Sequence, residues 1–157
     1  FQAGLTAVML ELAKMLVRDG ERVTKLVEVR VSGAKSTEDA KLVAQAVGNS
    51  NLVKSSWNGN DPNWGRIIHA VGYSGAEIDQ TKVDISFGGR LAAQNGLTYD
   101  STPLEELIAI VSEPEFSVEI DLKLGNCDHT VFASDLSPEY VDFNRAEYAA
   151  LFAKQST

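Results

Sequence analysis

A mixed α/β fold is predicted for this chain of 157 residues, because helix-like and strand-like segments are interleaved along it. Apolar and charged residues alternate over 27–31 and again over 118–124, as in half-buried strands. Amphipathic helix patterns lie before, between and after these two segments. Since both tight turns and helical crossovers connect the elements, we expect a mixed sheet, in the α/β or α+β class.

The N-terminal segment, residues 1–19, repeats apolar residues at the spacing of an amphipathic helix. These apolar positions are Leu5, Val8, Met9, Leu12, Met15 and Leu16. Gly20 is the expected left-handed stop of the helix. The chain begins at Phe1 rather than at a methionine, and the segment is already in mid-helix pattern. We therefore expect a fragment or a processed product of a longer protein.

A strand and a capped helix are predicted next. Valines alternate with charged residues over 27–31, which is typical of a strand with one buried face. Ser36 is the expected N-cap of a helix that ends at Gly48, because acidic residues follow it in the positively polarised first turn. The next segment, NLVKSSW at 51–57, is interpreted as a short strand.

The stretch NGNDPNWGRIIHA, residues 58–70, has the least ordinary composition in the chain. Asp61 is the expected N-cap of a helix and Pro62 its first residue, while the two asparagines before them tolerate a left-handed turn. Arg66 lies one turn into this helix, where its guanidinium can bind backbone carbonyls or a carboxylate. A rigid loop-to-helix junction is the simpler interpretation, and an anion-binding helix N-terminus is the alternative.

Two hairpins and two further helices are predicted in the second half. Residues 82–89 and 91–96 are expected to be strands joined at a Gly-Gly turn. A helix is expected to start at Thr102 as N-cap, with the apolar stripe Leu104, Leu107, Ile108 and Val111. The strand at 118–124 is expected to pair with residues 129–134 as an antiparallel hairpin. The tail is expected to be a turn, a short extended piece and a terminal helix.

Composition limits the classes of function. Hydrophobic residues make up 44% and charged residues 23%, which is ordinary for a globular domain. The net charge of −8 repels phosphate backbones, and no basic run offsets it, so we expect neither nucleic-acid binding nor attachment to anionic membranes. No apolar run is long enough to span a bilayer. A single cysteine, Cys127, fits a reducing, cytoplasmic setting.

Most candidate catalytic groups have a simpler explanation. Cys127, Asp128 and His129 are adjacent, and neighbours on a strand point to opposite faces, so they cannot form a relay. His69 has no second ligand at metal-binding spacing, and no metal site is expected. The charged segment VRDGERVTK is most simply a solvated, self-paired cluster. Its functional interpretation is that Glu21, held between helix and strand, binds a substrate ammonium group.

Two long motifs carry a resemblance: residues 4–34, which contain LVRDGE, and residues 49–75, which contain DPNWGRI. Both resemble the ornithine acetyltransferases, also called bifunctional glutamate N-acetyltransferases. VDISFGG at 83–89 and SDLSPEYVDFN at 134–144 follow in the expected order, so the resemblance covers nearly the whole chain. It implies that DPNWGRI has a structural role, fixing a loop against a helix.

The resemblance implies a reaction and a role for this chain. Such enzymes cut themselves into two chains, and a threonine at the N-terminus of the second, the β chain, transfers an acetyl group from N-acetylornithine to glutamate in arginine biosynthesis. This threonine would lie upstream of Phe1, so the chain would be the C-terminal part of a β chain, without a catalytic residue and inactive alone. Glu21 matches the acid that binds a substrate ammonium group, and Asn144 matches an asparagine that reaches into the site.

The resemblance also implies the surroundings of the chain. Residues 1–32 and 115–157 would belong to a layered αββα sandwich, and residues 33–114, which carry their own strands and helices, to a smaller α/β lobe. The partners would be the α chain and the N-terminal part of the β chain, in a heterotetramer of two α and two β chains, with N-acetylornithine and glutamate as substrates. No cofactor is implied, and acetyl-CoA would be a second acetyl donor in a bifunctional enzyme.

Two departures from the family bear on substrate choice. Arg22 stands where the family usually has a small residue, next to Glu21. Ala149 and Ala150 stand near the position of a hydroxyl that contacts substrate, and the chain continues beyond them. The alternatives from other classes are a non-catalytic domain that binds a small amino acid through its carboxylate, and a purely structural domain.

Overall fold

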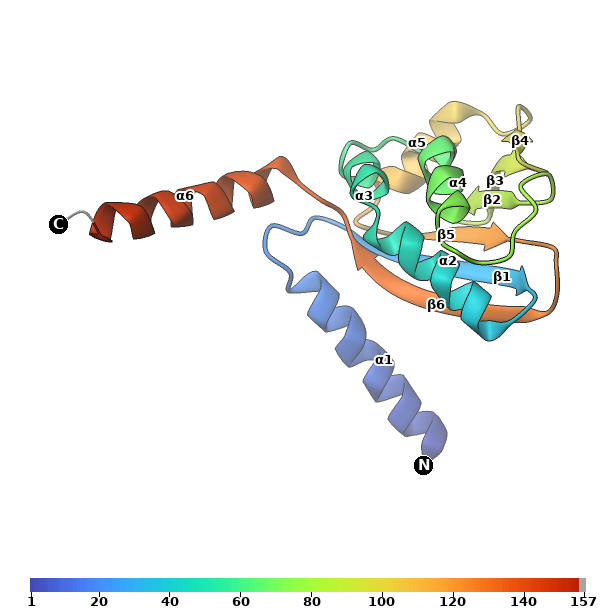
Figure 1. Cartoon of the computed structure of the whole chain (residues 1–157), viewed down its shortest axis with the longest axis horizontal. Helices are drawn as coiled ribbons and strands as arrows, with labels where there is room; N and C mark the ends of the chain where they lie inside the picture. Colours follow the sequence, from blue (N-terminus) through green and yellow to red (C-terminus); the bar gives the residue numbers. More distant parts are fainter. Residues whose placement is uncertain (156–157) are drawn as a thin grey trace.

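A six-stranded sheet with the order β4-β3-β2-β5-β1-β6 forms the centre of the computed structural model (Figure 1). The structure describes the backbone of residues 1–155 and the side chains of residues 1–148. The strands are β1 (Leu26–Ala34), β2 (Asp84–Phe87), β3 (Arg90–Gln94), β4 (Leu97–Thr98), β5 (Glu115–Asp121) and β6 (Cys127–Ser134). β1 and β5 are parallel and the other pairs antiparallel. The predicted mixed α/β class is confirmed.

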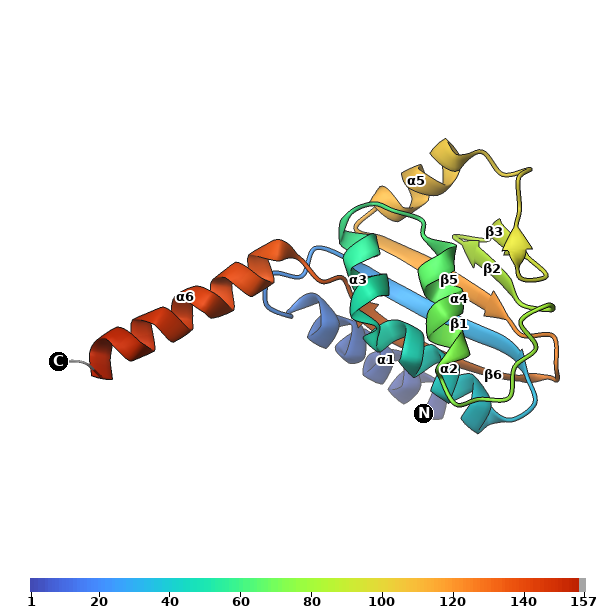
Figure 2. The same cartoon turned by 45° about the horizontal axis from the view of Figure 1, so that its top comes forward.

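Helices surround this sheet, and some of them cover one of its faces. They are α1 (Gln2–Arg18), α2 (Thr37–Asn49), α3 (Asn51–Asn58), α4 (Trp64–Gly72), α5 (Leu104–Ser112) and α6 (Pro138–Gln155). Figure 2 shows α2, α3 and α4 over the sheet, while α5 contacts β2 and β5. α1 contacts the edge strand β6, and α6 projects away from the sheet in both views. None of the described helices is long and apolar enough to cross a membrane.

The two faces of the sheet differ because the central strands alternate apolar and polar residues. Beneath the helices, the buried residues of β1 and β5 are Val27, Val29, Val31, Phe116, Val118 and Ile120. On the other face, Arg30 pairs with Glu28 at 2.8 Å and with Glu119 of the neighbouring strand at 3.6 Å. This open face is therefore polar and lined with paired charges.

Residues 51–57 form helix α3, so their prediction as a strand was wrong. The Ser50 hydroxyl accepts a hydrogen bond from the Val53 N–H at 3.4 Å and caps the helix. Val53 and Trp57, four residues apart, are both fully buried, which is the period of a helix. A short apolar run does not by itself distinguish a helix from a strand. Here the segment packs against α2 as a helix.

The predicted hairpin between β5 and β6 was also wrong, because β1 lies between these two strands. The connection crosses the end of β1, where the Leu124 and Gly125 N–H groups donate to the Gly33 carbonyl at 2.7 and 2.8 Å. The turn residues Gly125 and Asn126 would be the same whether β6 paired directly with β5 or crossed over β1 to pair with its far side. By contrast, the hairpin between β2 and β3 is confirmed.

Gly125→Ala is expected to destabilise the fold by about 1–3 kcal/mol, because a side chain overpacks this crossing. A Cβ at position 125 would lie inside the contact radius of the Ala34 carbonyl oxygen and 3.0 Å from the Lys35 Cα, and both are backbone atoms. Thermal unfolding followed by circular dichroism measures the change. Gly72→Ala is the matched control, since nothing lies within 4 Å of its Cβ. Equal midpoints for the two variants would contradict the prediction.

Several helix boundaries differ from their predictions. The N-cap of α4 is Asn63 rather than Asp61, and α5 is capped at Pro103 rather than Thr102. Gly20 is not the left-handed residue after α1; that conformation belongs to Arg22, with φ 57°. Within α5 only two of the four stripe residues are buried, and the exposed ones are Leu104 and Ile108. Ser36 caps α2 as predicted, accepting from the Asp39 N–H at 3.0 Å.

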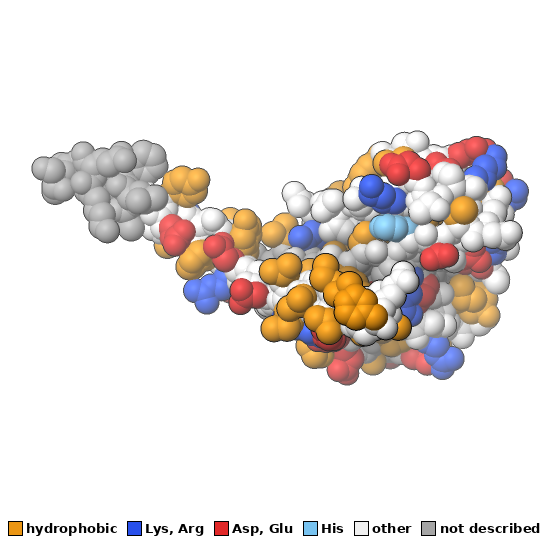
Figure 3. Space-filling model, turned by 90° about the horizontal axis from the view of Figure 1, so that it is seen from below, with side chains coloured by type: hydrophobic (Ala, Val, Ile, Leu, Met, Phe, Trp, Pro, Cys, Tyr) orange, Lys and Arg blue, Asp and Glu red, His pale blue; other side chains and the backbone are white. Residues whose placement is uncertain are grey.

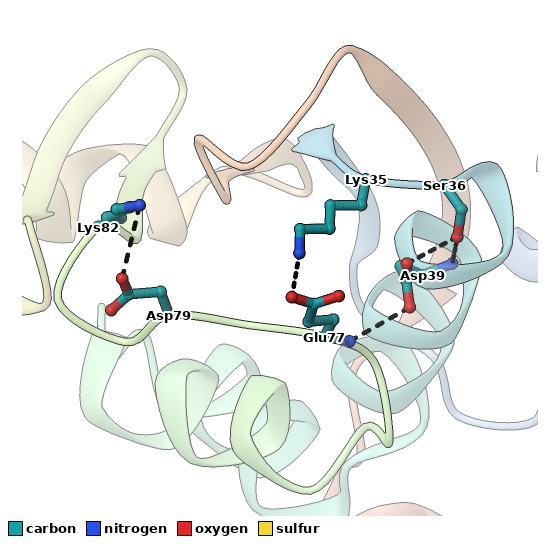
Figure 4. A network of polar contacts seen from close by, with 6 residues as sticks. All are labelled: Lys35, Ser36, Asp39, Glu77, Asp79 and Lys82. Atoms are coloured by element: carbon teal, nitrogen blue, oxygen red, sulfur yellow. Dashed lines mark hydrogen bonds and ion pairs between the residues drawn. The ribbon is translucent and has the colours of Figure 1, made fainter.

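A polar network fixes the connection between α4 and β2 on the start of α2 (Figure 4). Asp39 accepts hydrogen bonds from the Ser36 hydroxyl at 2.6 Å and from the Glu77 N–H at 3.2 Å, and these contacts lower its pKa. Lys35 pairs with the Glu77 carboxylate, and Lys82 with Asp79 at 3.6 Å. Strands β2–β4 extend the same sheet through β5, and the division at residues 33 and 114 stays a prediction.

Candidate functional site

Glu21 lies exposed in the turn between α1 and β1. The turn is closed by a hydrogen bond from the Val23 N–H to the Gly20 carbonyl at 3.2 Å. The next residue, Arg22, has a left-handed backbone, which is uncommon for a residue with a long side chain. The carboxylate of Glu21 is therefore presented to solvent from a turn of defined shape.

Asn144 lies on helix α6 and is partly buried. Its side-chain amide donates to the Tyr140 carbonyl one turn earlier, at 2.9 Å. The helix already begins at Pro138, so the short extended piece predicted before it was wrong. The side chains of Ala149 and Ala150 lie outside the described residues.

The structure brings the segments that carry Glu21 and Asn144 into contact. The hydroxyl of Ser137 donates to the Arg22 carbonyl at 2.9 Å and accepts from the Tyr140 N–H at 3.1 Å, which caps α6. The guanidinium carbon of Arg22 lies 5.0 Å from the centre of the Phe143 ring. Glu21 directly precedes Arg22, and Asn144 directly follows Phe143. Each predicted substrate residue is thus next in sequence to one residue of the Arg22–Phe143 contact.

A buried carboxylate, Asp135, anchors the same turn. It is 3% exposed and accepts hydrogen bonds from the Thr24 N–H at 2.9 Å, the Thr24 hydroxyl at 2.5 Å, the Lys25 N–H at 3.0 Å and the Asn58 amide at 2.8 Å. Burial raises the pKa of this carboxyl, but the hydrogen bonds from Thr24, Asn58 and Lys25 outweigh it and hold the pKa below its ordinary value. Asp135 is therefore a charged anchor between the start of β1, the end of β6 and α3.

Lys25 is the buried cation of this network. Its ammonium donates to the Asn60 side chain and to the Val111 carbonyl, and lies 5.9 Å from the centre of the Phe116 ring. Burial lowers its pKa, and the nearby Asp135 carboxylate opposes the change. Sequence reasoning did not identify either charged residue. The available signal was their position, since each directly flanks a strand, but only the β1–β6 pairing brings them together.

The NGNDPNWGRIIHA stretch has a structural role in this arrangement. Asn58 and Asn60 bind the buried charges, and Asn60 takes the predicted left-handed conformation with φ 54°. Arg66 donates to the Leu52 carbonyl at 2.8 Å and to the Ser55 hydroxyl at 3.3 Å. Its guanidinium thus binds α3, as expected for a rigid junction rather than an anion site.

The remaining candidate groups are not brought to this turn. Cys127 lies near the Lys35 carbonyl at 3.8 Å, and His69 packs against Tyr73 with 5.3 Å between ring centres. The described residues contain no group of three or more His, Cys, Asp or Glu residues placed to hold a metal ion.

Helix α1 presents a large exposed apolar surface beside the turn. Its predicted apolar side chains, Leu5, Val8, Met9, Leu12, Met15 and Leu16, are all between 50 and 77% exposed. Figure 3 shows hydrophobic side chains gathered on this helix. Exposed patches of this kind mark surfaces for other protein segments.

The chain is similar to proteins of a known family. The model of the ArgJ family matches residues 1–150. The arginine biosynthesis bifunctional protein ArgJ of Syntrophotalea carbinolica is 48% identical over 144 residues, which are 92% of this chain and 36% of that protein. A protein of Methanosarcina mazei named glutamate N-acetyltransferase is 43% identical over 152 residues, covering 94% of this chain and 38% of that protein. The chain thus spans a little over a third of the length of these relatives.

A solved structure has the same fold. The arginine biosynthesis bifunctional protein argJ from Bacillus halodurans, known from a crystal structure, matches with a TM-score of 0.88 and 36% sequence identity. The match covers 92% of this chain and 68% of that chain. The mixed sheet and its layer of helices are therefore shared with that structure.

Proposed function

The chain belongs to the ArgJ family, and on this premise we propose that it is the C-terminal part of the β chain of a glutamate N-acetyltransferase. The observation that carries the proposal is the family match over residues 1–150. The names of the two relatives support the chemistry, since one is a glutamate N-acetyltransferase and the other acts in arginine biosynthesis.

The proposed reaction runs through an acetyl-threonine ester. The threonine hydroxyl, at the N-terminus of the intact β chain and upstream of Phe1, attacks the acetyl carbonyl of N-acetylornithine, and the ornithine amine leaves with a proton. The α-amine of glutamate then attacks the ester, which releases N-acetylglutamate and restores the hydroxyl. Splitting the transfer in this way replaces one difficult amide exchange by two easier steps. In a bifunctional enzyme acetyl-CoA would acylate the same threonine.

Glu21 and Asn144 are proposed to bind substrate. An exposed carboxylate on a fixed turn suits the side-chain ammonium group of ornithine, because the charge-assisted hydrogen bond is stronger than a neutral one. The Asn144 amide is partly buried on the adjoining helix and has one hydrogen bond within the helix, so its carbonyl oxygen has acceptor capacity left for substrate.

The rest of the protein is proposed to complete the site and cover the open surfaces. The α chain and the N-terminal part of the β chain would pack on the apolar side of α1 and on the open sheet face, giving the αββα sandwich. Two α and two β chains would form the heterotetramer. A cytoplasmic location fits a chain with one cysteine, which forms no disulfide within it.

An acetyl-transfer assay tests the proposal. The intact protein is expected to form N-acetylglutamate from N-acetylornithine and glutamate, whereas residues 1–157 alone are expected to form none. In the intact protein, Glu21→Gln should lower kcat/KM for N-acetylornithine by about 10- to 100-fold, the range for losing a hydrogen bond to a charged group. Glu105→Gln is the matched control, because this glutamate is exposed on α5.

Two outcomes would contradict the proposal. Absence of transfer by the intact protein would refute the reaction. Unchanged kinetics in Glu21→Gln, with an active wild type, would refute only the role of Glu21 and would favour a structural role for its turn.

A further inference from the structure

The guanidinium group of Arg22 is available for a ligand at the place where the Glu21 turn meets α6. The other arginines all bind groups within the chain: Arg18 to Glu115, Arg30 to Glu28, Arg66 to Leu52, Arg90 to Glu106 and Arg145 to Asp142. Among the described side chains, no carboxylate pairs with Arg22. Its charge is therefore not neutralised within this part of the protein.

We propose that Arg22 binds the α-carboxylate that the acetyl donor and the acetyl acceptor share. The proposal rests on the proposed function, since it assigns a further binding group to the same site. N-acetylornithine and glutamate differ in their side chains, but both carry a carboxylate on the α-carbon. An enzyme that binds them in turn can hold both through one cation.

The backbone of Arg22 is fixed by long-range contacts. Its left-handed conformation, φ 57°, is one that long side chains rarely adopt. The Ser137 hydroxyl, 115 residues away in sequence, holds the Arg22 carbonyl at 2.9 Å. Such a conformation persists only where surrounding contacts enforce it, and it is typical of ligand-binding segments.

The side chain of Arg22 is also oriented. The guanidinium carbon lies 5.0 Å from the centre of the Phe143 ring, which restrains it by a cation–π contact. An arginine in such a contact can still use its planar N–H groups to bind a carboxylate in two places. Phe143 directly precedes Asn144 and Arg22 directly follows Glu21, so a carboxylate bound here would lie on the two segments that carry the candidate substrate residues.

Two other cations next to the turn, Lys25 and Arg18, are already bound within the chain. Lys25 is buried and donates to Asn60 and Val111. Arg18, at the end of α1, binds the Glu115 carboxylate through two nitrogens at 2.8 and 3.2 Å. Because the chain has a net charge of −8, an anionic substrate needs a local positive group.

Discrimination between glutamate and its α-amide by the intact enzyme tests the proposal. The amide lacks the charge that Arg22 would bind but keeps the amine that accepts the acetyl group. For the wild type, kcat/KM is expected to favour glutamate by about 10- to 100-fold. Arg22→Gln should reduce this ratio to near 1, chiefly through loss of activity with glutamate. Arg22→Lys should keep part of the preference for glutamate, because lysine keeps the positive charge but lacks the planar guanidinium that binds a carboxylate through two N–H groups.

Two controls separate binding from support of the fold. Arg22→Asn is neutral and suits a left-handed backbone, so it keeps the test open if the glutamine variant does not fold. Phe143→Leu removes the aromatic ring but leaves the positive charge of Arg22. In this variant the preference in kcat/KM for glutamate over its α-amide should remain larger than in Arg22→Gln. An active enzyme whose ratio is unchanged in both neutral variants would overturn the proposal. A wild type without any acetyl transfer would instead refute the proposed function.

Discussion

Asp135→Ala is expected to lower the free energy of unfolding by about 3–5 kcal/mol, the cost of breaking a buried charged network from one side. The substitution leaves the Thr24 and Lys25 N–H groups and the Asn58 amide without their acceptor. It also leaves the buried Lys25 ammonium without its nearby negative charge. Urea denaturation of wild type and variant at neutral pH measures the difference.

Acid provides a second measurement of the same carboxylate. The pKa of Asp135 in the folded chain lies below the ordinary value of 3.8, so its stabilising contribution is present above that value and is lost as the pH falls through the folded pKa. The stability difference between wild type and Asp135→Asn should therefore narrow only below about pH 3.8. Asn58→Ala is the control, because it removes one donor and no charge. A loss of less than about 1 kcal/mol in Asp135→Ala, the net worth of one ordinary hydrogen bond, would contradict the prediction.

Local patterns were sufficient for some of the fold. The Ser36 cap, the alternating faces of β1 and β5 and the Gly-Gly hairpin between β2 and β3 each depend on residues close together in sequence, and all are present. The order of the strands depends on contacts between distant segments. β1 inserts between β5 and β6, and no turn signal around residue 125 distinguishes that crossing from a hairpin.

The NGNDPNWGRIIHA stretch shows why its role could be predicted only in part. Its turn and helix follow from local preferences, and the Asn60 conformation is as expected. The partners of its asparagines are Asp135, 77 residues from Asn58, and Lys25, 35 residues from Asn60. These partners flank β6 and β1, so they meet only after the sheet has formed.

The candidate site has the same dependence on distant contacts. Glu21 and Asn144 were identified from the resemblance to a family, and neither has a periodicity that marks it. Their neighbours Arg22 and Phe143 meet because Ser137 joins the start of α6 to the turn. The same Ser137 hydroxyl caps α6, so one contact joins the start of the helix to a turn 115 residues earlier in the sequence.

Trp57→Ala is expected to cost about 3–5 kcal/mol, because truncating a fully buried aromatic side chain leaves a large cavity. The ring lies edge-on to Phe116, with 6.2 Å between centres and 85° between planes. Phe116 in turn lies under the Lys25 ammonium, and Asn58 follows Trp57 at the end of α3. The cavity would thus open beneath the network that holds the Glu21 turn.

Trp57→Phe separates the packing of this side chain from its polar atom. The indole N–H is buried and has no hydrogen-bond partner among the described residues. Burying such a group unpaired is unfavourable, so its removal offsets part of the lost volume. We therefore expect the phenylalanine variant to lose no more than about 1–2 kcal/mol, in urea denaturation under the same conditions as the alanine variant. Equal losses in the two variants would contradict this prediction.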